Sequence, residues 1–296
     1  MTSIRQLAWS PNGKKLACLR QDHKVDLWDA TNGYEYESSG RYQQDIANRT
    51  EAFRAQAHDD MMRVYAIHMR HRKFDLAIAI TSKALQENVN NAMVLFARGQ
   101  ALHESKRYEE AIVDFDRVLS IDANHQGAWY SRGLAEKQHG RHSDAKESFK
   151  KVLQIKDRLV RDNPDNSAYL NTLAWLLGTH LYPDLRDPTR AVELAREAVR
   201  LSPWNGRYIR TLGFAQYSAG DWQNAITTLN KSAELQGGGN GYDWFFLAMP
   251  HWQIDQKDEA RTWYDKAVEW MDENQRTDES LLRFRAEAEE LLSRTH

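Results

Sequence analysis

The residues best suited to chemistry in this sequence are eleven histidines and a single cysteine, Cys18. His68 and His71 lie three residues apart, so one helix face could present both rings. Metal binding would need further ligands nearby, and the sequence shows none; the motifs H-E-x-x-H, C-x-x-C and G-x-S-x-G are also absent. We therefore predict no metal, cofactor or catalytic site, and we interpret the chain as a protein without enzymatic activity.

Charge and composition narrow the classes of partner. The formal net charge is −2, and basic residues alternate with acidic ones, which argues against nucleic acid as a ligand. No stretch approaches the roughly 20 apolar residues of a membrane helix, and no secretion signal opens the sequence. Because Cys18 has no second cysteine to pair with, no disulfide framework is expected. These features predict a cytoplasmic protein that binds neither membranes nor nucleic acid.

A period of 34 residues organises most of the chain. Three segments align without a gap, at 58–91, 92–125 and 126–159. The same small residue recurs in the middle of each, as Ala77, Ala111 and Ala145. Three further units follow at 167–205, 206–239 and 241–274. A repeat of this length indicates a solenoid built from supersecondary units that cannot bury their apolar face alone.

Each unit reads as two helices. Leu170, Leu173 and Leu177 recur at helical spacing in the first half of one unit. Apolar residues recur at the same spacing in its second half. Small residues at Gly99, Gly133 and Gly213 would let paired helices approach closely. Asp187-Pro188 predicts a helix start, with Asp as the cap and Pro at the first helical position. Stacked hairpins of this kind form a solenoid with a concave side.

These residues resemble the tetratricopeptide repeat (TPR) pattern, W-x2-L-G-x2-Y followed by A-x3-F, A and P. The matches include Trp129 with Gly133, Ala111 with Phe115, Ala145 with Phe149, and Pro203. The resemblance covers residues 58–274. It implies a mainly α fold, a right-handed α-solenoid of about six hairpins.

The N-terminal forty residues differ from the rest. Short β-type runs alternate with the turns Pro11-Asn12-Gly13 and Asn32-Gly33, and Leu27-Trp28-Asp29 ends the third run. This resembles one blade of a WD40 propeller, in the domain order of the C-terminal part of bacterial WD40–TPR proteins. The alternative is an ordinary β-meander. Either would be a small antiparallel sheet with bare strand edges, through which the chain could self-associate.

The predicted domain organisation follows from these segments. A C-terminal amphipathic stretch is expected to cap the open end of the solenoid, and the helix before residue 160 is extended by about two turns. The predicted parts are 1–40 (blade-like β-meander), 41–57 (linker and helix), 58–159 (units 1–3), 160–166 (linker), 167–274 (units 4–6) and 275–296 (capping helix).

The TPR resemblance also implies a peptide-binding groove lined by the first helix of each hairpin. Carrying the family's groove positions onto this chain gives Met62, Phe96, Tyr130, Trp175, Arg207, Arg210, Phe214, Tyr217, Tyr242, Phe245 and Trp252, and position 12 adds Lys137. Aromatic rings and Arg dominate binding energies. The alternative for such a stripe is burial in the core. Pro250 falls inside a predicted first helix, so a kink is expected there.

The sequence thus favours a non-catalytic scaffold that binds a partner peptide or helix in this groove. Arg207 and Arg210, near several rings, suggest a ligand segment that carries an acidic and an aromatic group. The residues needed for the family's chaperone-tail clamp are absent. The alternative function is a regulatory or assembly segment of a larger WD40–TPR or kinase-linked bacterial protein.

Overall fold

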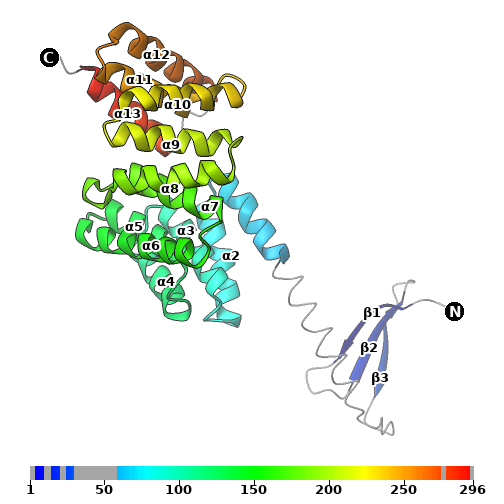
Figure 1. Ribbon diagram of the computed structural model, residues 1–296. Helices are drawn as coiled ribbons and strands as arrows, with labels where there is room; N and C mark the ends of the chain where they lie inside the picture. The colour runs from blue at the N-terminus through cyan, green and yellow to red at the C-terminus, as the bar shows by residue number, and fades with distance from the viewer. Residues whose placement is uncertain (1–3, 10–14, 21–24, 30–58, 275–277, 294–296) are drawn as a thin grey trace. The chain divides into compact units, whose positions relative to one another are not determined.

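The structure is a computed structural model that describes residues 4–9, 15–20, 25–29, 59–274 and 278–293 (Figure 1). The chain divides into two compact units, Met1–Ala66 and Ile67–His296. The first unit carries a small sheet, and the second carries the helical repeats.

Three strands form the sheet of the first unit, antiparallel and in sequence order. They are β1 (Ile4–Trp9), β2 (Lys15–Arg20) and β3 (Val25–Asp29). Leu16 on the central strand is in register with Trp9 on one side and Trp28 on the other. A propeller blade is a four-stranded sheet, so these three strands do not establish the blade interpretation of residues 1–40. Both predicted turns lie outside the described residues.

The second unit is an α-solenoid of helical hairpins, whose first and second helices alternate along the chain. Each helix packs against its partner and then against the next hairpin. Residues 59–70 are helical and precede the labelled helices. These are α2 (Phe74–Glu87), α3 (Ala92–Glu104), α4 (Tyr108–Ile121), α5 (Gln126–Gln138), α6 (His142–Asp162), α7 (Ser167–Thr179), α8 (Pro188–Leu201), α9 (Gly206–Ser218), α10 (Trp222–Leu235), α11 (Gly241–Gln253), α12 (Lys257–Asn274) and α13 (Glu279–Ser293).

Side-chain caps set where the helices begin. The Asp187 carboxylate accepts the backbone N–H of Arg190 at 3.0 Å, and Pro188 opens α8. This confirms the helix start predicted from Asp187-Pro188, because Pro loses no hydrogen bond at that position. Similar caps begin the first helices α3, α5, α7, α9 and α11, at Asn91, His125, Asn166, Asn205 and Asn240.

Glycine allows the two helices of a hairpin to pack closely. A Cβ added to Gly99 would lie 2.6 Å from the ring of Phe115, and one on Gly213 would lie 2.6 Å from Leu229 Cγ. Real Cβ atoms do not come this close to their neighbours, so a larger residue would push the helices apart. The prediction that small residues permit close helix approach is confirmed.

The helix α6 is longer than its counterparts. It has 21 residues, whereas α4 and α8 have 14 each. The difference is about two helical turns, as the sequence predicted. Val160, near the end of α6, packs in one cluster with Leu170 and Leu173 of α7, so the extension forms part of the junction between units 3 and 4.

The largest core lies at the C-terminal end of the solenoid. Its buried residues are Phe214, Ile226, Leu229, Trp244, Phe245, Phe246, Leu247, Met249, Ala267, Met271, Leu281, Phe284 and Ala288. Nearly all of α11 is buried, Pro250 included, and α11 remains helical to Gln253. Packing on several sides of α11 therefore offsets the lost backbone hydrogen bond at Pro250.

The last helix, α13, departs from the stacking pattern. Of the helices that precede it in the chain, each earlier first helix packs chiefly against the second helix of the hairpin before it. In contrast, α13 packs chiefly against α11, a first helix, and touches α12 much less (red in Figure 1). The predicted capping helix thus lies over a first helix, where its side chains Leu281 and Phe284 join the same core.

Candidate binding groove

The candidate site is the surface formed by the first helices α5, α7, α9 and α11, here called the first-helix face. Trp175 of α7 lies 6.0 Å from Phe214 of α9 and 6.5 Å from Tyr242 of α11, measured between ring centroids. Tyr217 joins them, 5.9 Å from Phe214. The structure therefore brings together side chains from three hairpins that the sequence placed in one groove.

Three of the predicted groove residues lie in the core instead. Phe214, Phe245 and Trp252 are 3%, 0% and 6% exposed, so they present almost no surface to a ligand. The Phe245 ring packs 5.8 Å from Tyr264 of α12, inside its own hairpin. Trp252 lies under the ammonium of Lys257 at 3.8 Å. The burial of Phe245 and Trp252 follows from the position of α11, which is covered by α10, α12 and α13. Phe214 of α9 is covered by the rings of Phe246 and Phe284.

The two residues of the predicted cationic pair, Arg207 and Arg210, also lie in different environments. Arg210 Nη1 lies 3.4 Å from a carboxylate oxygen of Asp243, which is fully buried. The same guanidinium lies 5.3 Å from the Tyr242 ring centroid. Arg210 therefore compensates a buried charge and is not a free anion receptor. Arg207 is exposed to solvent.

Phe96 packs at a junction other than that of the ring cluster. Phe96 packs 5.8 Å from Phe115 and 5.0 Å from the ring of His125, at the junction between units 2 and 3. Met62 lies on helical residues 59–70, within the first compact unit, and is half-buried. The predicted groove position of Phe96 therefore places its ring against its own hairpin and the start of the next one.

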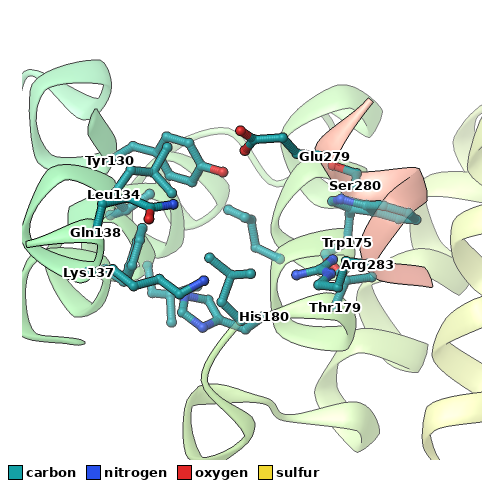
Figure 2. A pocket seen from close by; sticks show the side chains of 15 residues that line it. Tyr130, Leu134, Lys137, Gln138, Trp175, Thr179, His180, Glu279, Ser280 and Arg283 are labelled. Atoms are coloured by element: carbon teal, nitrogen blue, oxygen red, sulfur yellow. The ribbon is translucent and has the colours of Figure 1, made fainter. Parts of the chain in front are cut away.

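A pocket opens at the end of the first-helix face (Figure 2). Its volume is about 250 Å³, and its walls come from α5, α6, α7, the segment after α7 and the first turns of α13. Tyr130 is 42% exposed, which leaves its ring accessible. The lining residues are Tyr130, Leu134, Lys137, Gln138, Phe149, Val152, Leu153, Trp175, Leu176, Thr179, His180, Leu181, Glu279, Ser280 and Arg283.

Two cationic side chains line this pocket. Lys137 and Arg283 point into it from opposite sides (Figure 2). Arg283 shares the carboxylate of Glu287 with Arg186, at 3.8 and 3.6 Å. Burial, opposed by Glu287 and reinforced by Arg186, lowers the pKa of Arg283. A guanidinium nevertheless stays charged at neutral pH, so the pocket can attract an anionic group.

His180 adds a neutral ring to the same wall. Burial, followed by the positive charges of Arg186 and Arg283, lowers its pKa to about 4. Burial likewise raises the pKa of the Tyr130 hydroxyl, which stays protonated. At pH 7 the pocket therefore combines two cations with neutral, hydrogen-bonding rings, and Glu279 is its acidic lining residue.

Sequence reasoning placed Tyr130, Trp175 and Lys137 in the groove but missed His180 and Arg283. His180 follows the last turn of α7, outside the repeat positions that carry the family pattern. Arg283 lies on α13, which the sequence assigned to the end of the solenoid. The alternation of Arg283 with the apolar Leu281 and Phe284 was visible, but it did not say which surface the helix would cover.

Comparison with known proteins identifies the type of the repeats. Two family models, each described as tetratricopeptide repeat, match residues 92–125 and 127–158. The chain contains tetratricopeptide repeats. The first match has the bounds predicted for the second unit. Neither match reaches residues 1–40, so neither the WD40-like interpretation nor the larger WD40–TPR or kinase-linked alternative gains support.

Solved structures resemble the TPR array in fold. A tetratricopeptide repeat protein from Parabacteroides merdae ATCC 43184 is 17% identical, with a TM-score of 0.51 over 77% of this chain and 83% of its own. The pilF protein of Pseudomonas aeruginosa is 16% identical, with a TM-score of 0.49 over 79% and 99%. A thermophilic TPR protein of Thermus thermophilus is 20% identical, with a TM-score of 0.45 over 68% and 98%. No curated protein matches the chain.

Metal-binding and membrane-spanning features are both missing from the described part of the TPR chain. Within the residues that the structure describes, no cluster of three or more His, Cys, Asp or Glu side chains is arranged to hold a metal ion. No helix among those residues has the length and apolar character needed to cross a membrane.

Proposed function

We propose that this TPR chain is a non-catalytic interaction scaffold that binds a peptide or helix of a partner protein along its first-helix face. TPR proteins act as protein-interaction scaffolds, and the repeats are present here. The observation that carries the proposal is the open pocket beside the ring cluster, where Tyr130 and Trp175 line the wall and Lys137 and Arg283 point inward.

The chemistry of the pocket favours an acidic side chain next to an apolar or aromatic one. Lys137 and Arg283 both point into the pocket, so a carboxylate placed between them would be attracted by two cations. Leu134 and Trp175 offer apolar surface beside it. This retains the acidic and aromatic ligand expected from the sequence, but transfers the cationic role from Arg207 and Arg210 to Lys137 and Arg283.

Affinity capture with the full chain tests this proposal. The partner recovered by the wild type would then be titrated against the single variants Tyr130→Ala and Lys137→Glu. Each should weaken binding by at least about tenfold, since hot-spot side chains carry about 1.4 kcal/mol or more. Lys137→Glu should also make the affinity less sensitive to salt.

Two control variants match these in residue type. Trp204 is 79% exposed in the α8–α9 connection, and Lys231 is exposed on α10, a second helix. Trp204→Ala and Lys231→Glu should bind the partner as the wild type does. Equal affinity of all four variants would contradict a site in the pocket.

A further inference from the structure

One helix face at the start of the repeat array is exposed where its counterparts in the next units are buried. Ile67, on the helical residues 59–70, is 53% exposed. Its counterparts one and two repeat periods later are Ala101 and Ala135, and both are 0% exposed. Ala135 packs in one cluster with Phe115 of α4, the second helix of the preceding hairpin. The face that carries Ile67 is therefore the one by which later first helices pack against the hairpin before them.

The residue types on this face differ from those of its counterparts. Asp60, Val64 and Ile67 lie four and three residues apart, so they form one stripe along the helix, and Val64 is 41% exposed. The counterparts of Asp60 are Val94 and Ala128, which are 1% and 0% exposed. Stacking of the kind seen in units 2 and 3 would bury the Asp60 carboxylate and would place Ile where the array has Ala. The stripe therefore suits a different occupant.

The charges along this helix are divided between its two ends. Acidic residues lie at its start, and basic residues lie at or just after its end: Asp59, Asp60, Arg70, Arg72 and Lys73. This division stabilises the helix itself, because each end carries the charge that opposes the helix dipole. It also makes the stripe self-complementary. Two copies packed antiparallel would bring the acidic end of each opposite the basic end of the other, and Val64 of one opposite Ile67 of the other.

We propose that the chain forms a homodimer in which the helices of residues 59–70 from two copies pack antiparallel along this stripe. The inference does not rest on the proposed function, because α5, α6, α7 and α13 contribute nothing to the seam. A seam about 18 Å long, at about 1.5 Å per residue, buries less than the roughly 1,600 Å² of a standard interface. The dimer therefore dissociates reversibly at micromolar concentration, and it presents two copies of the pocket to a partner.

Sedimentation equilibrium of the full chain over a series of micromolar concentrations tests the dimer. The wild type should pass from monomer to dimer within the series. Ile67→Lys places a charge at the centre of the seam and should raise the dissociation constant at least about tenfold. Val113→Lys is the matched control, since Val113 is 58% exposed on α4. That variant should dimerise as the wild type does.

Charge exchange gives a second arm that leaves the core intact, since the altered residues are all exposed. The Asp59→Lys/Asp60→Lys chain and the Arg70→Glu/Lys73→Glu chain should each stay monomeric, because like charges then meet at both ends of the seam. An equimolar mixture of the two should form a heterodimer. Recovery of association on mixing cannot arise from a folding defect, so this arm decides if Ile67→Lys proves unfolded by circular dichroism.

Three results would overturn the inference. One is a wild type that stays monomeric throughout the series, which would leave the face to another occupant. Another is a dimer that persists in Ile67→Lys, which would place self-association elsewhere, such as at the strand edges of the small sheet. The third is a mixture of the two charge variants that stays monomeric. Loss of partner binding in Tyr130→Ala with the dimer unchanged reports on the pocket alone, so the two proposals can fail separately.

Discussion

The backbone N–H of Tyr182 donates to Nδ1 of His180 over 3.1 Å. That nitrogen must therefore be unprotonated, and the imidazole is neutral with its hydrogen on Nε2. The ring is buried, edge-on to Phe149 with centroids 5.3 Å apart. Burial of a charged ring, followed by the nearby positive charges of Arg186 and Arg283, lowers the pKa of His180 to about 4.

This arrangement predicts that the protein loses stability in mild acid. The unfolded chain binds a proton at His180 below its ordinary pKa of 6.5, whereas the folded chain does so only near 4. The free energy of unfolding therefore falls as the pH drops through that window, by about 3 kcal/mol in total. Urea unfolding between pH 7 and pH 4.5 should show a shallower slope for His180→Gln. His71→Gln, on an exposed ring, should keep the wild-type slope, and equal slopes for both variants would contradict the assignment.

Glycines on the first helices predict a graded series of alanine variants. Gly99→Ala would place Cβ 2.6 Å from Phe115, whereas Gly133→Ala would place it 3.0 Å from Phe149. Gly99→Ala should destabilise the fold by about 1–3 kcal/mol, and Gly133→Ala by less. At Gly178 the nearest atom is 3.6 Å away, so alanine should be neutral or should gain up to about 1 kcal/mol from helix propensity. Thermal unfolding of the three variants checks the order, and a Gly178→Ala variant as unstable as Gly99→Ala would refute it.

The ion pair between Arg98 and Asp114 predicts unequal effects of neutralising its two members. The guanidinium donates to both carboxylate oxygens at 2.7 Å, and Asp114 is 2% exposed while the Arg98 side chain is 22% exposed. Arg98→Met leaves a buried carboxylate without its partner and should cost about 3 kcal/mol. Asp114→Asn leaves a guanidinium that can reach water, so it should cost less. Urea unfolding gives both values, and a larger effect of Asp114→Asn would contradict the explanation.

The repeats could be predicted from the sequence because their signals are local. Period, caps and close-packing glycines each act within one hairpin or between adjacent ones, as at Asp187 and Gly99. The exposure of single rings could not be predicted, since adjacent residues on a helix point about 100° apart. Phe245 thus packs against α12, whereas Phe246 meets Phe284 of α13.

The residues of the site could not be predicted from repeat positions, because contacts between distant parts of the sequence determine them. Arg210 was expected to bind a ligand, but it forms an ion pair with Asp243 on α11 instead. Arg283 was assigned to a cap, but α13 lies along α11 and carries it to the pocket. The amphipathic pattern of α13 established that it must pack against something, and only the structure identified the surface.

Glu136 predicts a pH dependence of opposite sign to that of His180. Its carboxylate is 1% exposed, accepts a hydrogen bond from the Ser148 hydroxyl at 2.7 Å and lies 3.2 Å from Arg132. Burial outweighs both partners and raises the pKa of Glu136. The folded chain therefore holds this proton more tightly than the unfolded chain does.

Stability from the protonated carboxyl is fully present below the ordinary pKa of 4.5 and is lost as the pH rises through the folded value. Glu136→Gln keeps the shape without the ionisation, so its stability relative to the wild type should increase from pH 4.5 to pH 7. Glu193→Gln, on an exposed carboxylate of α8, should show no such trend. Urea titrations at both pH values measure the difference. A Glu136→Gln variant that loses stability relative to the wild type as the pH rises would mean that the ion pair with Arg132 outweighs the burial of the charge.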